Sequence, residues 1–166
     1  MSVTDEILRS NQAYAAQFNL GHLPMPPARR LAVVACMDAR LTVEQFLGLK
    51  TGDAHIIRNA GGLVTDDALR SLIISHHLLG TQEFVIVEHT DCGMLTFEDG
   101  ELRARLEKET GATADSPRAF LAFSNLEENV RKQIAKVRAH PWLGKAVPVR
   151  GFIYDVKTGR MQEVKV

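Results

Sequence analysis

Two short, uninterrupted apolar runs constrain the fold of this chain more than any other feature. They are Leu31–Ala35 and Phe84–Val87. Each run is shorter than a typical helix and lacks the alternation of a strand with one wet face, so each predicts a strand buried on both faces. Strands of this kind occur mainly in parallel sheets that helices cover on both sides. We therefore expect an α/β fold with helices on both faces of the sheet.

The segment between these runs supplies a further strand and a helix. Ala54–Ile57 predicts the strand, and Thr65 is the predicted N-cap of a helix that reaches Leu79 and stops at Gly80. Strands that alternate with helices indicate βαβ units. With strands numbered along the chain, right-handed crossovers then favour a mainly parallel central sheet of strand order 2-1-3-4.

The two ends of the chain have different patterns. Residues 149–156 and 161–166 alternate around a glycine-containing turn, which predicts a C-terminal β-hairpin with an antiparallel strand. Residues 1–30 predict an N-terminal helical arm: a helix over residues 4–18, capped by Thr4, precedes an extended segment with three prolines. Residues 99–111 and 125–140 have the spacing of surface helices. We expect residues 1–166 to form a single domain.

Composition narrows the function classes. The 20 Lys and Arg residues balance 20 Asp and Glu residues, and the formal net charge is zero. This balance opposes partners that depend on a bulk electrostatic field, so we expect neither nucleic-acid nor membrane binding. We see no secretory signal and no apolar stretch of about 18 residues. A cytoplasmic location follows, where separated cysteines more often serve metal binding or catalysis than a disulfide.

Three residues with metal-ligating side chains follow two of the predicted strands. Cys36 ends the first apolar run, and His89 and Cys92 follow the Phe84–Val87 run; the chain has no other cysteine. Because the carboxyl ends of neighbouring parallel strands meet at one sheet edge, these side chains are expected to converge. Two thiolates and an imidazole form the ligand number of a catalytic zinc site that keeps its fourth position open.

Asp38 and Arg40 lie close to the first cysteine in the sequence. Arg40 is placed to keep Asp38 ionised and turned away from the metal, where the carboxylate would accept a hydrogen bond from zinc-bound hydroxide. Without that partner, Asp38 is a conditional fourth ligand that would close the site. Two thiolates and a neutral imidazole also neutralise the dication, so we expect activity to favour alkaline pH.

Four segments together resemble the β-class carbonic anhydrases, in particular the compact bacterial members. They are Cys36-x-Asp38-x-Arg40, Arg58–Gly61, His89–Gly93 and the hairpin from Gly151 to Gly159. The resemblance implies Zn²⁺ on Cys36, His89 and Cys92, an Asp38/Arg40 catalytic dyad, and reversible hydration of carbon dioxide to bicarbonate. It also implies a homodimer or a dimer of dimers in which the N-terminal arm packs on the neighbouring subunit.

Two positions depart from patterns found within that family. Pro27 stands where plant-type members place a substrate-contacting glutamine, and the tryptophan of a bicarbonate-inhibited subgroup has no counterpart near the dyad, because the sole tryptophan is Trp142. The substrate-polarising donor is thus unassigned, and we do not expect that inhibition.

Three alternatives stay open at this point. Relatives of the family hydrolyse carbonyl sulfide or carbon disulfide with the same ligand set. A non-catalytic zinc module would hold Asp38 permanently on the metal. A cysteine hydrolase would use Cys36 or Cys92 as nucleophile and His89 as base.

Overall fold

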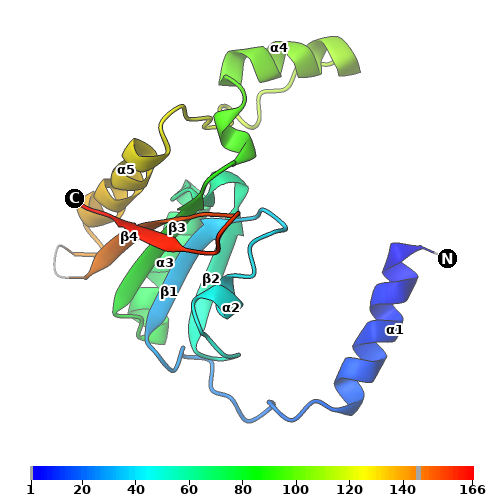
Figure 1. Ribbon diagram of the computed structural model, residues 1–166, viewed down its shortest axis with the longest axis vertical. Coiled ribbons are helices and arrows are strands. Elements are labelled where there is room, and N and C mark those ends of the chain that lie inside the picture. The colour runs from blue at the N-terminus through cyan, green and yellow to red at the C-terminus, as the bar shows by residue number, and fades with distance from the viewer. Residues whose placement is uncertain (1, 145–146) are drawn as a thin grey trace.

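A five-stranded sheet forms the centre of the molecule (Figure 1). The computed structural model describes residues 2–144 and 147–166. The strands are β1 (Leu31–Cys36), β2 (Ala54–Asn59), β3 (Glu83–His89), β4 (Val149–Tyr154) and β5 (Met161–Val164). Their order is β2-β1-β3-β4-β5; the first four are parallel, and β5 pairs antiparallel with β4. The predicted fold class and strand order are confirmed.

Five α-helices and two short 3₁₀ helices connect or flank the strands. The α-helices are α1 (Val3–Ala16), α2 (Val43–Phe46), α3 (Asp66–Leu79), α4 (Asp99–Thr110) and α5 (Leu126–Ala139), and the 3₁₀ helices are η1 (Ala60–Gly62) and η2 (Gly93–Leu95), all within the described residues. The sequence prediction missed α2, because four residues are too few to show a helical period.

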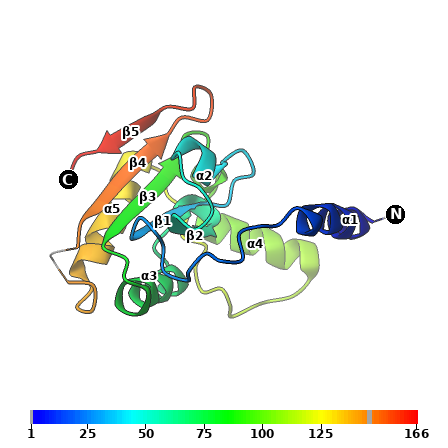
Figure 2. The same ribbon diagram turned by 90° about the horizontal axis from the view of Figure 1, so that it is seen from below.

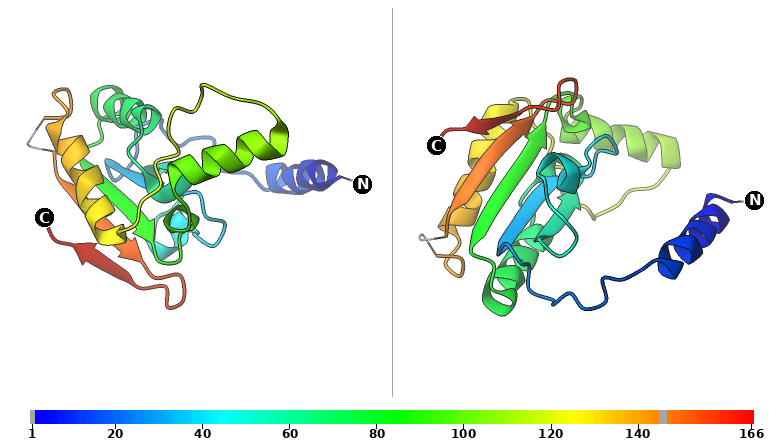
Figure 3. Two further views of the ribbon diagram at one scale, coloured as in Figure 1. Left: turned by 90° about the horizontal axis from the view of Figure 1, so that it is seen from above. Right: turned by 60° about the horizontal axis from the view of Figure 1, so that its bottom comes forward.

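Helices cover both faces of the sheet, and each face has its own apolar core. On one face, Leu72 of α3 and Ile134 of α5 pack with Val34 of β1 (Figure 2). On the opposite face, Val43 of α2 packs with Val33 of β1 (Figure 3, right). Adjacent residues of β1 therefore enter different cores. This arrangement explains why the strand is continuously apolar.

α5 belongs to the core and is not only a surface helix. Val130, Ile134 and Val137 are fully or almost fully buried. The helix lies so close to β4 that a Cβ on Gly151 would fall 2.4 Å from a methyl group of Val130. Glycine at this position lets the helix and strand approach each other.

Helix ends provide a second comparison with the sequence. Thr65 caps α3 by accepting a hydrogen bond from Ala68 N, and Gly80 ends that helix in the left-handed conformation, as predicted. The predicted Thr4 cap of α1 is wrong. Ser2 is the N-cap, because its hydroxyl accepts from Asp5 N while Asp5 accepts from Ser2 N, which completes a capping box.

Two segments project from the sheet and its packed helices. α1 lies apart at the end of an extended segment, and α4 extends beyond the carboxyl ends of the strands (Figure 1). No residue of α1 is buried. In residues 2–144 and 147–166, no helix is both long enough and apolar enough to cross a membrane.

Candidate metal centre

Three buried side chains converge at the carboxyl edge of the sheet. The potential ligand atoms of Cys36, His89 and Cys92 all lie within 4.8 Å of one another. Cys36 is the last residue of β1 and His89 the last of β3, and these strands are parallel neighbours. The sheet therefore brings together residues that are far apart in the sequence.

A tight turn returns Cys92 to the same point. Asp91, directly before it, has a φ of 56°, in the left-handed region that aspartate tolerates better than most residues. Cys92 O then accepts a hydrogen bond from the N–H of Leu95, the last residue of η2. This geometry turns the thiol back toward Cys36 only three residues after His89.

The three donors fit a tetrahedral zinc ion. Zinc bonds to sulfur and nitrogen place such donors about 3.5–3.8 Å apart, within the observed spread. His89 Nδ1 lies 2.8 Å from Thr90 O, and because a carbonyl can only accept, Nδ1 carries the proton. Nε2 then keeps its lone pair. Nε2 is buried and has no hydrogen-bond partner among the described residues, which fits a nitrogen that binds a metal ion.

The two thiols have opposite acidities because they share one hydrogen bond. A bond from Cys92 lowers the pKa of the Cys36 thiol, and the backbone amides of Asp38 and Gly61 act in the same direction, whereas burial opposes them. The same bond, and then burial, raises the pKa of Cys92. A cation among the ligands would replace the proton between the sulfurs, so metal binding releases protons.

Asp38 and Arg40 form the predicted ion pair beside the three ligands. Arg40 donates from Nε to Asp38 Oδ1 at 2.9 Å and from a terminal nitrogen to Oδ2 at 2.7 Å. These hydrogen bonds hold the pKa of Asp38 far below its usual range. Asp38 Oδ2 lies 3.7 Å from His89 Nε2. The ionised carboxylate thus borders the ligand cluster while both its oxygens face Arg40.

Comparison with known proteins identifies the family. The family model described as Carbonic anhydrase matches residues 31–161, which include β1 to β4 and the residues of this cluster. The chain belongs to the β-carbonic anhydrase family.

Several relatives of this family resemble the whole chain. Beta-carbonic anhydrase 1 of Mycobacterium tuberculosis is 48% identical over 165 residues, covering 99% of both chains. The crystal structure of carbonic anhydrase from Streptococcus mutans superposes with a TM-score of 0.93 at 47% identity, again covering 99% of both chains. A carbon disulfide hydrolase of Acidithiobacillus thiooxidans is 37% identical over 157 residues, covering 83% of this chain and 78% of the relative.

Asp91 has a different role from the one that its sequence position suggested. Its place between His89 and Cys92 would suit a residue that stabilises its own turn or one that hydrogen-bonds to His89. Instead its carboxylate accepts from Arg40 at 2.7 Å, and its carbonyl oxygen accepts from the same guanidinium at 3.0 Å. In this β-carbonic anhydrase family member, Arg40 therefore links the loop after β1 to the loop after β3.

Arg58 is a supporting residue for which sequence reasoning found no role. It donates to Cys36 O at 2.9 Å and to Asp38 O at 2.7 Å. These bonds hold the backbone that carries a thiol and the carboxylate. The only sequence signal was its place in the Arg58–Gly61 segment after β2.

The loop after β2 approaches the ligand-bearing strands very closely. A Cβ on Gly62 would lie 2.8 Å from Val87 O and 2.9 Å from Cys36 N, and the residue has a φ of 70°. Only glycine satisfies both conditions without displacing backbone. Turn geometry therefore accounts for this glycine, whereas an approach of the Gly61 and Gly62 backbone amides to a small substrate stays a prediction.

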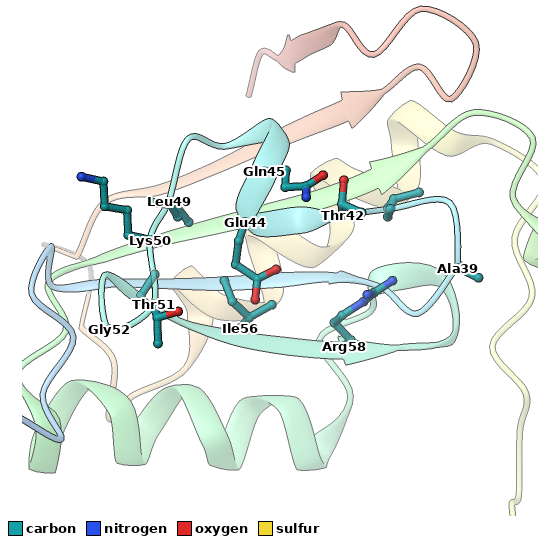
Figure 4. Close-up of a pocket in the computed structure, with 12 residues that line it drawn as sticks. Ala39, Thr42, Glu44, Gln45, Leu49, Lys50, Thr51, Gly52, Ile56 and Arg58 are labelled. Carbon is teal, nitrogen blue, oxygen red and sulfur yellow. The ribbon is translucent and has the colours of Figure 1, made fainter. Parts of the chain in front are cut away.

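An open groove of about 1000 Å³ runs from the loop after β1 to the start of β2 (Figure 4). Ala39 and Arg58 line one end, next to Asp38, and Lys50 and Gly52 line the other. None of the three clustered ligands lines it. The groove is therefore a neighbour of the metal centre and not the place where the ligands meet.

Proposed function

We propose that this chain binds Zn²⁺ through Cys36, His89 and Cys92 and catalyses the reversible hydration of carbon dioxide to bicarbonate and a proton. The observation that carries the proposal is the buried convergence of these three ligand atoms within 4.8 Å, with an ionised carboxylate beside them. The 48% identity to a carbonic anhydrase over almost the full chain supports the choice of reaction.

The proposed division of labour follows from the contacts. Zinc would supply a Lewis acid that makes water nucleophilic near neutral pH. Asp38 would accept a hydrogen bond from the attacking water and orient it, and Arg40 would keep that carboxylate ionised. The Nδ1–H bond of His89 to Thr90 O would fix the ring with Nε2 toward the metal.

We propose an open site in which Asp38 is not a zinc ligand. Support comes from its bonds to Arg40, which occupy both carboxylate oxygens, and from its absence from the ligand group among the described residues. Two thiolates and a neutral imidazole balance the charge of Zn²⁺. The pKa of zinc-bound water would then be lowered less than on a zinc ion with only neutral protein ligands, and turnover would rise toward alkaline pH.

We further propose a cytoplasmic homodimer or dimer of dimers. Both cysteines are free thiols, which a reducing compartment preserves for metal binding. α1 leaves Val3, Ile7, Leu8 and Tyr14 more than half exposed. A second copy of the chain would cover these side chains in the arrangement that the family resemblance implies.

Stopped-flow hydration of carbon dioxide with a pH indicator tests the activity. We expect a rate far above buffer that disappears on zinc removal and returns with Zn²⁺. Hydrogen sulfide released from carbon disulfide or carbonyl sulfide, without carbon dioxide hydration, would show the alternative hydrolase. Zinc binding with neither activity would support a non-catalytic module, whereas hydrolysis that survives zinc removal would indicate a cysteine nucleophile.

A further inference from the structure

A chain of buried polar side chains lies behind the ligand-bearing strands. Glu88 Oε1 accepts from Asn129 Nδ2 at 2.8 Å, and Asn129 Oδ1 accepts from Gln133 Nε2 at 3.1 Å. Gln133 Oε1 accepts from Val64 N at 2.9 Å. We call Glu88, Asn129 and Gln133 the polar relay. It joins β3 to α5 and α5 to the segment after η1.

The direction of every hydrogen bond in the polar relay is determined by its last member. Val64 N can only donate, so the atom of Gln133 that faces it must be the amide oxygen. The amide nitrogen of Gln133 then donates to Asn129, which leaves Asn129 Nδ2 to donate to Glu88. Glu88 Oε1 accepts in this arrangement whether the carboxyl group is ionised or protonated, so the relay does not depend on its charge.

The polar relay occupies a position where apolar residues would be the simpler choice. Glu88 is fully buried, and Asn129 and Gln133 are 8% and 7% exposed. Asn129 and Gln133 are buried on α5 together with Val130, Ile134 and Val137. Glu88 Oε2 has no partner among the described residues, and desolvation raises the pKa of this carboxyl to about 8. Burying polar groups costs stability unless hydrogen bonds compensate, so the unpaired Glu88 Oε2 leaves part of that cost in place.

What the relay holds is the loop packed against the ligands. Val64 follows Gly62 by two residues, with Leu63 between them, and a Cβ on Gly62 would lie only 2.9 Å from Cys36 N and 2.8 Å from Val87 O. The backbone amide of Gly61 is one of the donors that lower the pKa of the Cys36 thiol. Asn59 clamps the other side of the loop by bonding both N and O of Leu63. Movement of Val64 would therefore move the donor beside a zinc-binding sulfur.

We propose that the polar relay is a positioning device for the metal centre: through Val64 it holds the Gly61–Gly62 backbone against Cys36 and so sets the environment of that thiolate. This inference rests on the proposed zinc ligation but not on the reaction catalysed. The relay residues touch neither substrate nor metal. They act through the loop, on the face of the sheet opposite to His89.

The test uses the full chain loaded with Zn²⁺ or with Co²⁺, whose thiolate charge-transfer band reports on the metal–sulfur bonds. Gln133→Met removes both relay bonds of that side chain at similar length. We expect faster hydrogen exchange at Val64 N, a shifted cobalt band and zinc affinity reduced by about tenfold, the lower end of the range for residues that support ligands. Gln133→Glu keeps an acceptor for Val64 N and should recover much of the affinity.

Val130→Ala provides the matched control on the same helix. It removes buried packing against β4 but no relay bond. We expect this variant to lose thermal stability while its cobalt band and zinc affinity stay at wild-type values. Equal changes in Val130→Ala and Gln133→Met, or wild-type affinity and spectrum in Gln133→Met, would overturn the proposal. If Gln133→Met does not fold, Gln133→Ala, which also removes the acceptor of Val64 N, takes its place in the same comparison with Val130→Ala.

The outcome separates the relay from the proposed activity. A wild-type protein that shows the cobalt–thiolate band but hydrates no carbon dioxide would contradict the function and leave the relay testable by spectrum and affinity. If the wild-type protein is fully active and Gln133→Met leaves the cobalt band and the zinc affinity unchanged, only the proposal for the polar relay is contradicted.

Discussion

The sheet edge that carries the candidate metal ligands and the N-terminal helix differ in how far their side chains are covered by the same chain. Cys36, His89 and Cys92 are at most 4% exposed, and one chain supplies their neighbours. Helix α1 has no buried residue, although it carries large apolar side chains. The contrast indicates that the ligand cluster is assembled within one subunit, whereas the arm remains incomplete until something covers it.

Local interactions alone give α1 little stability. Its Ser2–Asp5 capping box contributes on the order of 1 kcal/mol, and an isolated helix of this length is marginal in water. The ligands, in contrast, lie at the ends of strands that two apolar cores hold in place. If α1 and the ligand cluster are as independent as this contrast implies, a change in one should leave the other intact.

Loss of a ligand should have the largest effect. Cys36→Ser, His89→Ala or Cys92→Ser removes one of three proposed protein ligands, so bound zinc and carbon dioxide hydration should disappear together. Metal analysis and stopped-flow rates measure both. His22→Ala, on the exposed arm, is the matched histidine control and should keep both. Full zinc content in all three ligand variants would refute the assignment.

Removal of the charge beside the ligands should separate metal binding from turnover. Asp38→Asn keeps the shape of the side chain but weakens it as an acceptor, and kcat is expected to fall by about 10²–10⁴ with zinc retained. Arg40→Ala should act in the same direction. Asp67→Asn changes an exposed acid on α3 and serves as the control. Unchanged turnover in both dyad variants would make the ion pair merely structural.

Charges on the apolar side of α1 should disrupt assembly and spare the metal centre. Ile7→Asp with Tyr14→Asp replaces two side chains whose burial contributes about 1.5–3 kcal/mol each, so the mass in solution should fall toward that of one chain. Light scattering measures it. Gln12→Asp with Ala16→Asp places the same charges on the opposite side of the helix and should leave assembly intact. If the Ile7→Asp, Tyr14→Asp variant lost bound zinc as well as mass in solution, the proposed independence of α1 and the metal centre would be wrong.

The smallest effect is expected at α4, which projects like α1 but is tied to its own chain. The Asp99 carboxylate accepts from Phe120, Leu121 and Ala122 N, and these bonds lower its pKa. A lowered pKa means that this stabilisation is present above the ordinary value of about 3.8 and is lost as pH falls through the folded-state pKa. The protection of the three amides from hydrogen exchange, measured against their intrinsic exchange rates, should therefore fall at acid pH.

Asp99→Ala should abolish that pH dependence and accelerate exchange at the three amides throughout, with zinc binding unchanged. Asp115→Ala, elsewhere in the same projecting segment, is the control. Slow exchange in Asp99→Ala would show that other contacts hold the segment.

Much of the fold was predictable because its signals are local. The continuous apolar runs predicted buried parallel strands, and Thr65 and Gly80 predicted both ends of α3. Errors arose where a local rule had a nearby competitor: Ser2 with Asp5 makes a better cap than Thr4. The role of α5 in the core was underestimated because its charged residues mask a narrow buried stripe.

The site was predictable for groups whose chemistry is read from residue type and less so for groups that support them. Two cysteines and a histidine at or just after the ends of predicted strands indicate metal ligands, whatever their order along the chain. Nothing in the sequence of Arg58, Asp91 or Gln133 indicates that Arg58 binds the Cys36 carbonyl, that Asp91 pairs with Arg40, or that Gln133 reaches Val64. Those contacts join residues up to 69 positions apart.

The sequence by itself determined which strands are buried, which residues are candidate metal ligands and where α3 begins and ends, because each depends on residues close together in the chain. The tertiary structure alone decided that the three ligand atoms meet within 4.8 Å, that Arg40 holds two aspartates and that a polar relay supports the loop beside Cys36. These facts depend on sheet order and helix packing. They arise only when distant segments are buried against one another.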